Sequence, residues 1–85
     1  MKVVFHKRFK RQVAKYPALS SQLDERIALF VNDPFHPMLN NHQLAGKWAR
    51  YRSINITGDY RAIYESVKDD LAYFVDLDTH GNLYR

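Results

Sequence analysis

The most constraining feature of this sequence is a change of hydrophobic period near its middle. After residue 47, apolar and polar side chains alternate with a period of two, which is typical of strands. Three strands are predicted there, over residues 48–56, 60–67 and 71–77. Their connections, Thr57-Gly58-Asp59 and Lys68-Asp69-Asp70, are short, so neighbouring strands must run in opposite directions. The second half of the chain is therefore predicted to be an antiparallel meander.

The first half of the chain shows a helical period instead. Residues 2–6 are rich in β-branched and aromatic side chains and predict a short strand. After it, Phe9, Val13 and Tyr16 are spaced four and three residues apart, as on one face of a helix over residues 6–16. Pro17 ends this predicted helix, because proline disfavours helical geometry in the residue before it.

A second helix is predicted before the sequence Asn32-Asp33-Pro34, which stops it. We expect Ser20 or Ser21 to cap its first turn. Its apolar stripe consists of Leu23, Ile27, Phe30 and Val31. The element order is therefore βααβββ, and the predicted fold class is α+β. In this fold a helical hairpin packs on one face of a small, mainly antiparallel sheet.

Alternation along residues 48–56 also predicts which side chains face the hairpin. Ile54 and Ile56 are the apolar pair of this strand, so we expect them to point toward the helices. Ser53 and Asn55 then point to the other face of the sheet. That face is expected to stay open to water and to carry the function.

The length of 85 residues predicts a single domain over residues 1–85, with room for one core and one shallow site. A deep cofactor pocket with a separate substrate domain does not fit this length, so no cofactor is expected. The sequence has no cysteine, which excludes disulfides and thiolate zinc sites. It shows no signal peptide and no run of about 18 apolar residues. We therefore expect a soluble, cytoplasmic protein without a membrane partner.

Positive charge is concentrated in two segments of this chain, whose formal net charge is +4. Residues 1–16 hold basic side chains and no acid. Residues 42–61 hold basic side chains against the single acid Asp59, and residues 62–85 are net acidic. If the fold joins the two basic segments, they form a surface suited to RNA, DNA or an acidic protein. The alternative for the first segment is a solvated helix face.

Several polar side chains in the second half could carry chemistry. They are His42, Asn55, Asp59, Arg61, His80 and Tyr84. Ordinary structural roles stay open for each, such as turn formation at Asp59, a surface ion pair at Arg61 or packing of Tyr84. The histidines and Asp59 match no known metal-binding spacing, so no metal site is expected.

On a basic sheet face, this set of side chains suits RNA cleavage without a metal ion. The 2′-hydroxyl attacks the adjacent phosphorus, which requires a general base, and the leaving 5′-oxygen requires a general acid. Histidine suits both proton transfers because its pKa lies near neutrality. The pentacoordinate phosphorane gains negative charge, which an arginine stabilises, and aromatic rings hold the splayed bases by stacking.

Four blocks of the sequence resemble the RelE/ParE toxin superfamily, and most closely its YafQ-like branch. They are His42-Gln43-Leu44-Ala45-Gly46, Tyr51-Arg52, Thr57-Gly58-Asp59-Tyr60-Arg61-Ala62-Ile63-Tyr64 and Thr79-His80-Gly81-Asn82-Leu83-Tyr84. The resemblance implies a RelE-like fold and the toxin of a bacterial type II toxin–antitoxin system. It also implies a ribosome-dependent mRNA endonuclease, an mRNA interferase that inhibits translation. Its implied partners are the ribosome with bound mRNA and a cognate antitoxin.

The resemblance also implies the site residues. His80 would act as general acid or base, with Asp59 orienting it or taking the 2′ proton. Arg61, which matches the RelE-like branch, would stabilise the phosphorane, and His42 would assist phosphate binding or proton transfer. Tyr84 would stack on a base or position the scissile phosphate.

Asn55 departs from the YafQ-like pattern, which has another histidine at this position. Asparagine binds phosphates or bases but cannot transfer a proton at neutral pH, so the identity of the general base is open. We assign Asn55, Lys47 and Arg50 to RNA binding. Two other functions are open on the same fold. They are a ParE-like inhibitor of DNA gyrase and a catalytically inactive module that binds the antitoxin.

Overall fold

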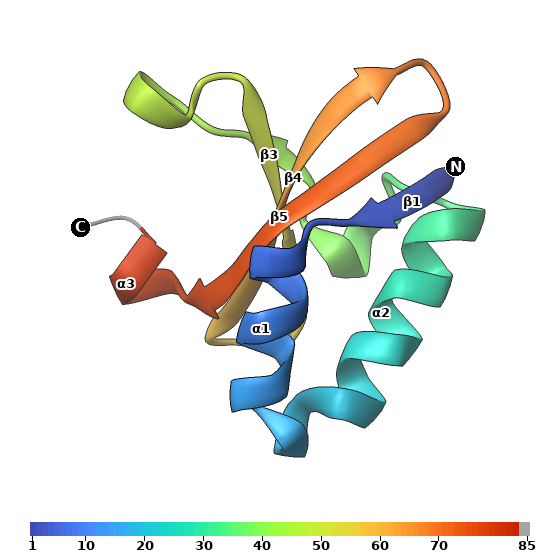
Figure 1. Ribbon diagram of the computed structural model, residues 1–85. Helices are drawn as coiled ribbons and strands as arrows, with labels where there is room; N and C mark the ends of the chain where they lie inside the picture. Colours follow the sequence, from blue (N-terminus) through green and yellow to red (C-terminus); the bar gives the residue numbers. More distant parts are fainter. Residues whose placement is uncertain (84–85) are drawn as a thin grey trace.

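The computed structural model describes residues 1–83 and packs a helical hairpin against a twisted sheet (Figure 1). The first half holds strand β1 (Lys2–Phe5), helix α1 (Lys7–Lys15), a 3₁₀ turn (Pro17–Leu19) and helix α2 (Ser20–Asn32). The second half holds strands β2 (His42–Gln43), β3 (Tyr51–Asn55), β4 (Tyr60–Lys68) and β5 (Leu71–Thr79), then helix α3 (His80–Leu83). Two more 3₁₀ turns, Pro37–Leu39 and Gly46–Trp48, precede β2 and β3. Within the described residues, none of the helices combines the length and apolar content that a membrane crossing requires.

The strand order of the sheet is β1-β5-β4-β3-β2. β1 runs parallel to β5, whereas the pairs β2–β3, β3–β4 and β4–β5 are antiparallel. The helical hairpin supplies the long connection that a parallel pair requires, so the first strand can lie beside the last. The predicted α+β fold with the order βααβββ is confirmed. The two-residue strand β2 is an addition, too short to show a period.

The predicted cap of α2 is wrong. The helix begins at Ser20, and the residue that precedes it, Leu19, makes no side-chain capping bond. The Ser20 N–H donates to the Pro17 carbonyl, so the 3₁₀ turn runs directly into the helix. Because this turn already provides a partner at the helix start, neither Ser20 nor Ser21 acts as a cap.

The predicted strand over residues 48–56 begins later than expected, at Tyr51. Gly46 has a φ of 63°, a left-handed conformation that glycine adopts without steric cost. It starts the 3₁₀ turn Gly46–Trp48, so Trp48, the first residue of the predicted strand, lies in this turn instead.

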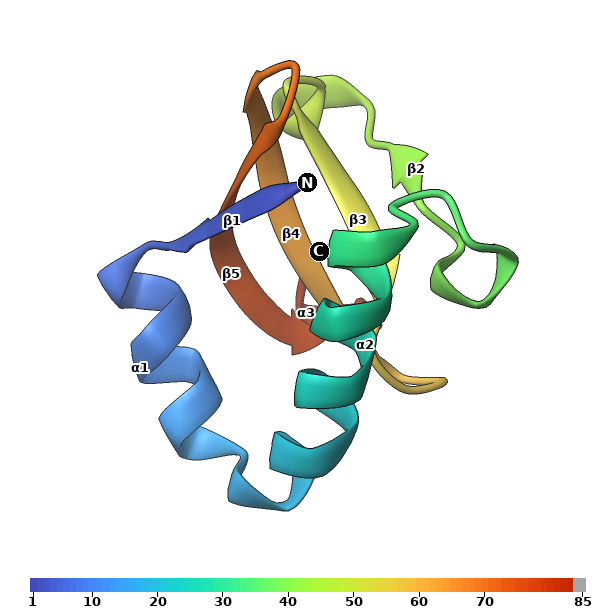
Figure 2. The same cartoon turned by 90° about the vertical axis from the view of Figure 1, so that its right-hand side faces the viewer.

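The main core lies between the hairpin and one face of the sheet, which we call the first face. Figure 2 shows α1 and α2 meeting at the Pro17–Leu19 turn and diverging from it. Phe74 of β5 is fully buried in this core and contacts other buried rings. These are Phe9 at 5.6 Å, Phe30 at 5.3 Å and Tyr64 at 5.2 Å between ring centroids. Ile54 and Ile56 lie in the same core, as predicted.

The opposite face of the sheet, the second face, is less open than predicted. Ser53 lies on it with Asn55 but is fully buried, and so is Ile63, which pairs with Ser53 on β4. Helix α3 lies on this side of the sheet, away from α2, and contacts β5 through a segment that ends in the buried Leu83 (Figure 1). Because serine is short, the longer side chains around it exclude water from this part of the face.

Candidate functional site

Cross-strand pairing aligns the candidate residues in two rows on the second face. One row consists of His42, Ser53, Ile63 and Asp76. The next row toward α3, which we call the Arg61 row, consists of Asn55, Arg61 and Asp78. Residues that pair directly across antiparallel strands point to the same face. The fold therefore puts predicted site residues from β2, β3 and β4 on one surface.

His42 lies exposed on the edge strand β2. Its Nδ1 is 2.8 Å from the carbonyl oxygen of Asn40, which has a left-handed backbone conformation with a φ of 45°. A carbonyl oxygen can only accept a hydrogen bond, so Nδ1 carries the hydrogen of the neutral ring. The other nitrogen, Nε2, then keeps its lone pair. In the neutral ring, Nε2 is therefore the nitrogen that can accept a hydrogen bond from a ligand.

Arg61 is held by the turn between β3 and β4. Its Nη1 donates to the carbonyl oxygens of Thr57 and Gly58, each at 3.2 Å. The Thr57 hydroxyl in turn accepts hydrogen bonds from the backbone N–H groups of Asp59 at 3.3 Å and Tyr60 at 3.1 Å. Within residues 1–83, no carboxylate forms an ion pair with Arg61. Its guanidinium is thus positioned by the turn without being neutralised.

The same turn is joined to the start of α3. The backbone N–H of His80 donates to the Asp59 carbonyl at 2.9 Å, and Tyr60 pairs with Thr79 at the end of β5. The side chains of Asp59 and His80 are both exposed. The fold therefore brings Asp59, Arg61 and His80 to one end of the second face.

Asp78 completes the Arg61 row and was not predicted from the sequence. Its Oδ1 accepts hydrogen bonds from Tyr16 at 3.1 Å, Asn82 at 3.1 Å and the backbone N–H of Thr79 at 2.8 Å. Burial opposes ionisation, but these hydrogen bonds outweigh it and lower the pKa of Asp78. Burial and the Asp78 carboxylate raise the pKa of Tyr16. The period-two spacing of Asp76, Asp78 and His80 was the signal that could have indicated this row.

Replacing Asp78 with asparagine is expected to destabilise the protein by about 1 kcal/mol at pH 7, because the hydrogen bonds lose their charge assistance. The folded-state pKa is lowered, so the carboxylate stabilises the fold above the unfolded-state pKa of about 3.9. This contribution is lost as the pH falls through the folded-state pKa. Urea unfolding at pH 7, 5 and 3 should show that the loss of unfolding free energy in the Asp78→Asn protein becomes smaller at low pH. Asp69→Asn in the exposed β4–β5 turn is the control. If Asp78→Asn lowered the unfolding free energy equally at every pH, the stabilising role of the ionised Asp78 carboxylate would be contradicted.

Three buried side-chain atoms of residues 1–83 have no hydrogen-bond partner. They are Ser53 Oγ, Asn55 Oδ1 and Trp48 Nε1. Ser53 and Asn55 lie on the second face, and Trp48 borders a hollow on it. Buried polar atoms almost always have partners, so unpaired ones point to a surface that is completed by water or by a ligand. Asn55 therefore offers a hydrogen-bond acceptor beside Arg61, but it has no group that transfers a proton at neutral pH.

The remaining predicted residues lie around the second face. Lys47 is exposed in the turn before β3. Arg50 is also exposed, and its Nη2 donates a hydrogen bond to the Glu65 carboxylate at 2.7 Å. This hydrogen bond and the negative charge of Glu65 raise the pKa of Arg50. Arg8 of α1 lines the same hollow as Trp48, so the two basic segments border one face, as the charge pattern suggested. Tyr84 lies outside the described residues.

The candidate residues do not converge at one point. Three strand spacings of about 4.8 Å separate β2 from β5, which puts the backbone of His42 roughly 14 Å from that of Asp76 in its own row, and His80 lies four residues beyond Asp76. Asp59, Arg61 and His80 are grouped, Asn55 and Asp78 lie beside them, and His42 stands at the opposite edge. Among residues 1–83, no three His, Asp or Glu side chains are grouped as a metal site requires. This arrangement suits an extended substrate that lies across the sheet better than a small ligand in a closed pocket.

This fold is that of a class of small bacterial toxins. YafQ from E. coli strain BL21(DE3) has a TM-score of 0.82 to this structure at 21% sequence identity, covering 99% of this chain and 98% of that one. A copper-bound mutant toxin from Helicobacter pylori has a TM-score of 0.79 at 30% identity, covering 99% of both chains. The E. coli DinJ-YafQ complex contains a chain with a TM-score of 0.79 at 21% identity, covering 99% of this chain and 98% of that one.

The family model of YafQ, a bacterial toxin of type II toxin–antitoxin systems, matches residues 1–85. The chain belongs to this toxin family, which confirms the resemblance seen in its motifs. A comparison with curated proteins finds no match.

Proposed function

We propose that this toxin is an endoribonuclease that cleaves mRNA on the ribosome and thereby inhibits translation. The observation that carries the proposal is the grouping of Asp59, Arg61 and His80 at one end of the second face. This grouping combines an acid, a fixed cation and a histidine, the three functions that phosphodiester cleavage by a 2′-hydroxyl requires.

In the proposed reaction, the 2′-oxygen bonds to the adjacent phosphorus and the bond to the 5′-oxygen breaks. The products are a 2′,3′-cyclic phosphate and a 5′-hydroxyl. One proton leaves the 2′-hydroxyl and another reaches the 5′-oxygen, so the protein needs an acceptor and a donor. His80 carries one of these transfers and Asp59, beside it, is the second partner, whereas His42, at the opposite edge, assists phosphate binding. The guanidinium of Arg61 stabilises the charge of the phosphorane, and the turn carbonyls that hold it reduce the cost of ordering it.

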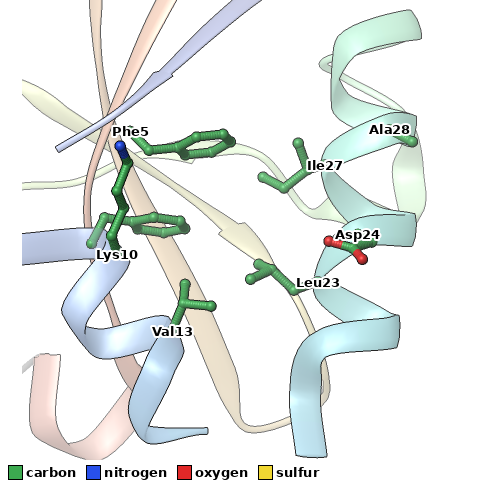
Figure 3. A pocket seen from close by; sticks show the side chains of 8 residues that line it. Phe5, Lys10, Val13, Leu23, Asp24, Ile27 and Ala28 are labelled. Atoms are coloured by element: carbon green, nitrogen blue, oxygen red, sulfur yellow. The ribbon is translucent and has the colours of Figure 1, made fainter. Parts of the chain in front are cut away.

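The proposed partners are the ribosome with its mRNA and a cognate antitoxin. Relatives solved as E. coli DinJ-YafQ complexes support the antitoxin. A groove of about 460 Å³ between α1 and α2 offers it an apolar surface. Figure 3 shows Phe5 and Val13 facing Leu23 and Ile27 across this groove. The exposed basic residues of α1 beside it, including Lys10, favour an acidic antitoxin segment.

Primer extension on mRNA in a programmed ribosome complex tests the proposed cleavage. Purified toxin, free of antitoxin, is expected to produce a new in-frame stop that is absent from the mock reaction. Supercoiled DNA with gyrase is assayed in parallel, where broken or knotted DNA would support a ParE-like gyrase inhibitor instead. Folded toxin that gives neither result would contradict both activities and favour an inactive antitoxin-binding module.

A further inference from the structure

A hollow on the second face lies at the far end of the strands from His80. Its volume is about 400 Å³, and its floor includes a cross-strand row of Tyr51, Glu65 and Tyr73 from β3, β4 and β5. We call this hollow the tyrosine pocket. Four residues along β3 separate Tyr51 from Asn55, which corresponds to roughly 13 Å. The tyrosine pocket is therefore on the same face as the Arg61 row but too far from it to hold the same nucleotide.

Aromatic rings stand on both sides of Glu65. On the β3 side, Trp48 and Tyr51 are in edge contact at 5.6 Å between centroids. On the β5 side, His6 contacts Tyr73 edge-on, also at 5.6 Å. Two strand spacings separate Tyr51 from Tyr73, about 10 Å between backbones. A planar ring needs about 7 Å between two stacking faces, and the volume of about 400 Å³ is sufficient for one flat heterocycle.

Carboxylates face the space between these rings. Both hydrogen bonds of Glu65 with Arg50, at 2.7 and 3.1 Å, use Oε2, which fixes the side chain and leaves Oε1 as an acceptor. Asp76 is 5% exposed and is held by Arg8 and Gln12, each at 3.3 Å. Ionised carboxylates can only accept, so two of them favour an exocyclic amine, which has two N–H donors, over the ring of uracil, which has the single donor N3–H. Adenine, cytosine and guanine carry an exocyclic amine, and uracil does not.

Trp48 gives the wall an additional donor. Its indole N–H is buried and has no acceptor among residues 1–83, which is an unfavourable arrangement. A small rotation toward an acceptor on a bound ligand would satisfy this donor. The wall of the tyrosine pocket is therefore suited to a ligand that has acceptors as well as an amine.

We propose that the tyrosine pocket binds one base of a single-stranded RNA, with a preference for bases that carry an exocyclic amine. The base stacks between Tyr51 and Tyr73, and Glu65 accepts a hydrogen bond from its amine. This inference rests on the proposed function, because it takes the RNA strand to run from the Arg61 row along the second face. It adds a subsite that selects the base of a nucleotide other than the one cleaved.

Trp48 is the single tryptophan of the chain, so its fluorescence reports on the tyrosine pocket directly. We would titrate the whole protein with 2′-O-methyl hexamers of adenosine, cytidine or uridine, which cannot be cleaved because no free 2′-hydroxyl is present. Adenosine and cytidine hexamers are expected to change the Trp48 fluorescence and to bind at least about 5-fold more tightly than uridine hexamers. Tyr73→Ala should weaken binding by about 5- to 150-fold, whereas Tyr73→Phe should bind like the native protein.

Matched variants separate base recognition from the general effect of removing an aromatic ring. Glu65→Gln should remove most of the preference over uridine, because an amide can both donate and accept. Phe35→Ala removes an aromatic ring that is 65% exposed outside the tyrosine pocket and should leave binding unchanged.

No fluorescence response at millimolar hexamer, or equal binding of all three hexamers, would overturn the proposal even if the toxin cleaves mRNA on the ribosome. Binding that depends on Tyr73 and Glu65 would support the tyrosine pocket even if no cleavage is found. Failure of the tyrosine pocket and failure of the proposed mRNA cleavage are therefore distinguishable.

Discussion

Replacing His80 with alanine is expected to lower the rate of mRNA cleavage on the ribosome by about 100-fold or more, if His80 transfers a proton in the reaction. His80 is exposed at the start of α3, and its backbone N–H to the Asp59 carbonyl does not depend on its side chain. The substitution keeps this backbone hydrogen bond and removes the imidazole that would transfer the proton. Primer extension with limiting toxin gives the rate, and thermal unfolding of both proteins checks the fold.

His36→Ala is the matched control for His80→Ala. The His36 ring accepts the Met38 N–H at the Pro37–Leu39 turn, which is not part of the second face. Its removal should leave the cleavage rate near that of the native toxin. A His80→Ala toxin that cuts at the native rate would exclude His80 from the chemistry.

Replacing Phe74 with alanine is expected to cost about 3–5 kcal/mol of unfolding free energy. Phe74 is fully buried where α1, α2 and the sheet meet, so its removal leaves a cavity among the rings of Phe9, Phe30 and Tyr64. Domains of this size have total stabilities of about 5–15 kcal/mol, so a large share would be lost. Urea unfolding followed by circular dichroism measures the change.

Phe35→Ala is the control for Phe74→Ala, since the Phe35 ring is 65% exposed and contacts the Arg52 guanidinium at 5.3 Å. Its loss should cost no more than about 1 kcal/mol. Phe74→Leu keeps most of the volume and should lie between the two. If Phe74→Ala costs as little as Phe35→Ala, the ring cluster does not support the fold as described.

Local patterns were sufficient to predict most of the fold. The spacing of Phe9, Val13 and Tyr16 predicted α1, the alternation around Ile54 and Ile56 predicted β3, and the short turns predicted the meander. The predicted starts of β3 and α2 were wrong because the 3₁₀ turns Gly46–Trp48 and Pro17–Leu19 are too short to show a periodic pattern in the sequence. Two-residue β2 was missed for the same reason.

The candidate site was predicted in its residue types but not in its arrangement. Asp59, Arg61 and His80 stand out in the motif blocks, and the structure groups them through one backbone hydrogen bond and one turn. Asp78 escaped notice because its role depends on Tyr16, a residue from the far end of the chain. The tyrosine pocket escaped notice because its rings come from separate strands.

The sequence by itself determined the element types, their order and the toxin family, because periodicity, turn residues and contiguous motifs are properties of neighbouring residues. Only the tertiary structure decided that β1 lies parallel to β5, that Ser53 is buried and that the Arg61 row and the tyrosine pocket share one face. These features depend on pairings between residues far apart in the chain. A register shift of one residue would turn every side chain of a strand to the other face, so the register decides the site.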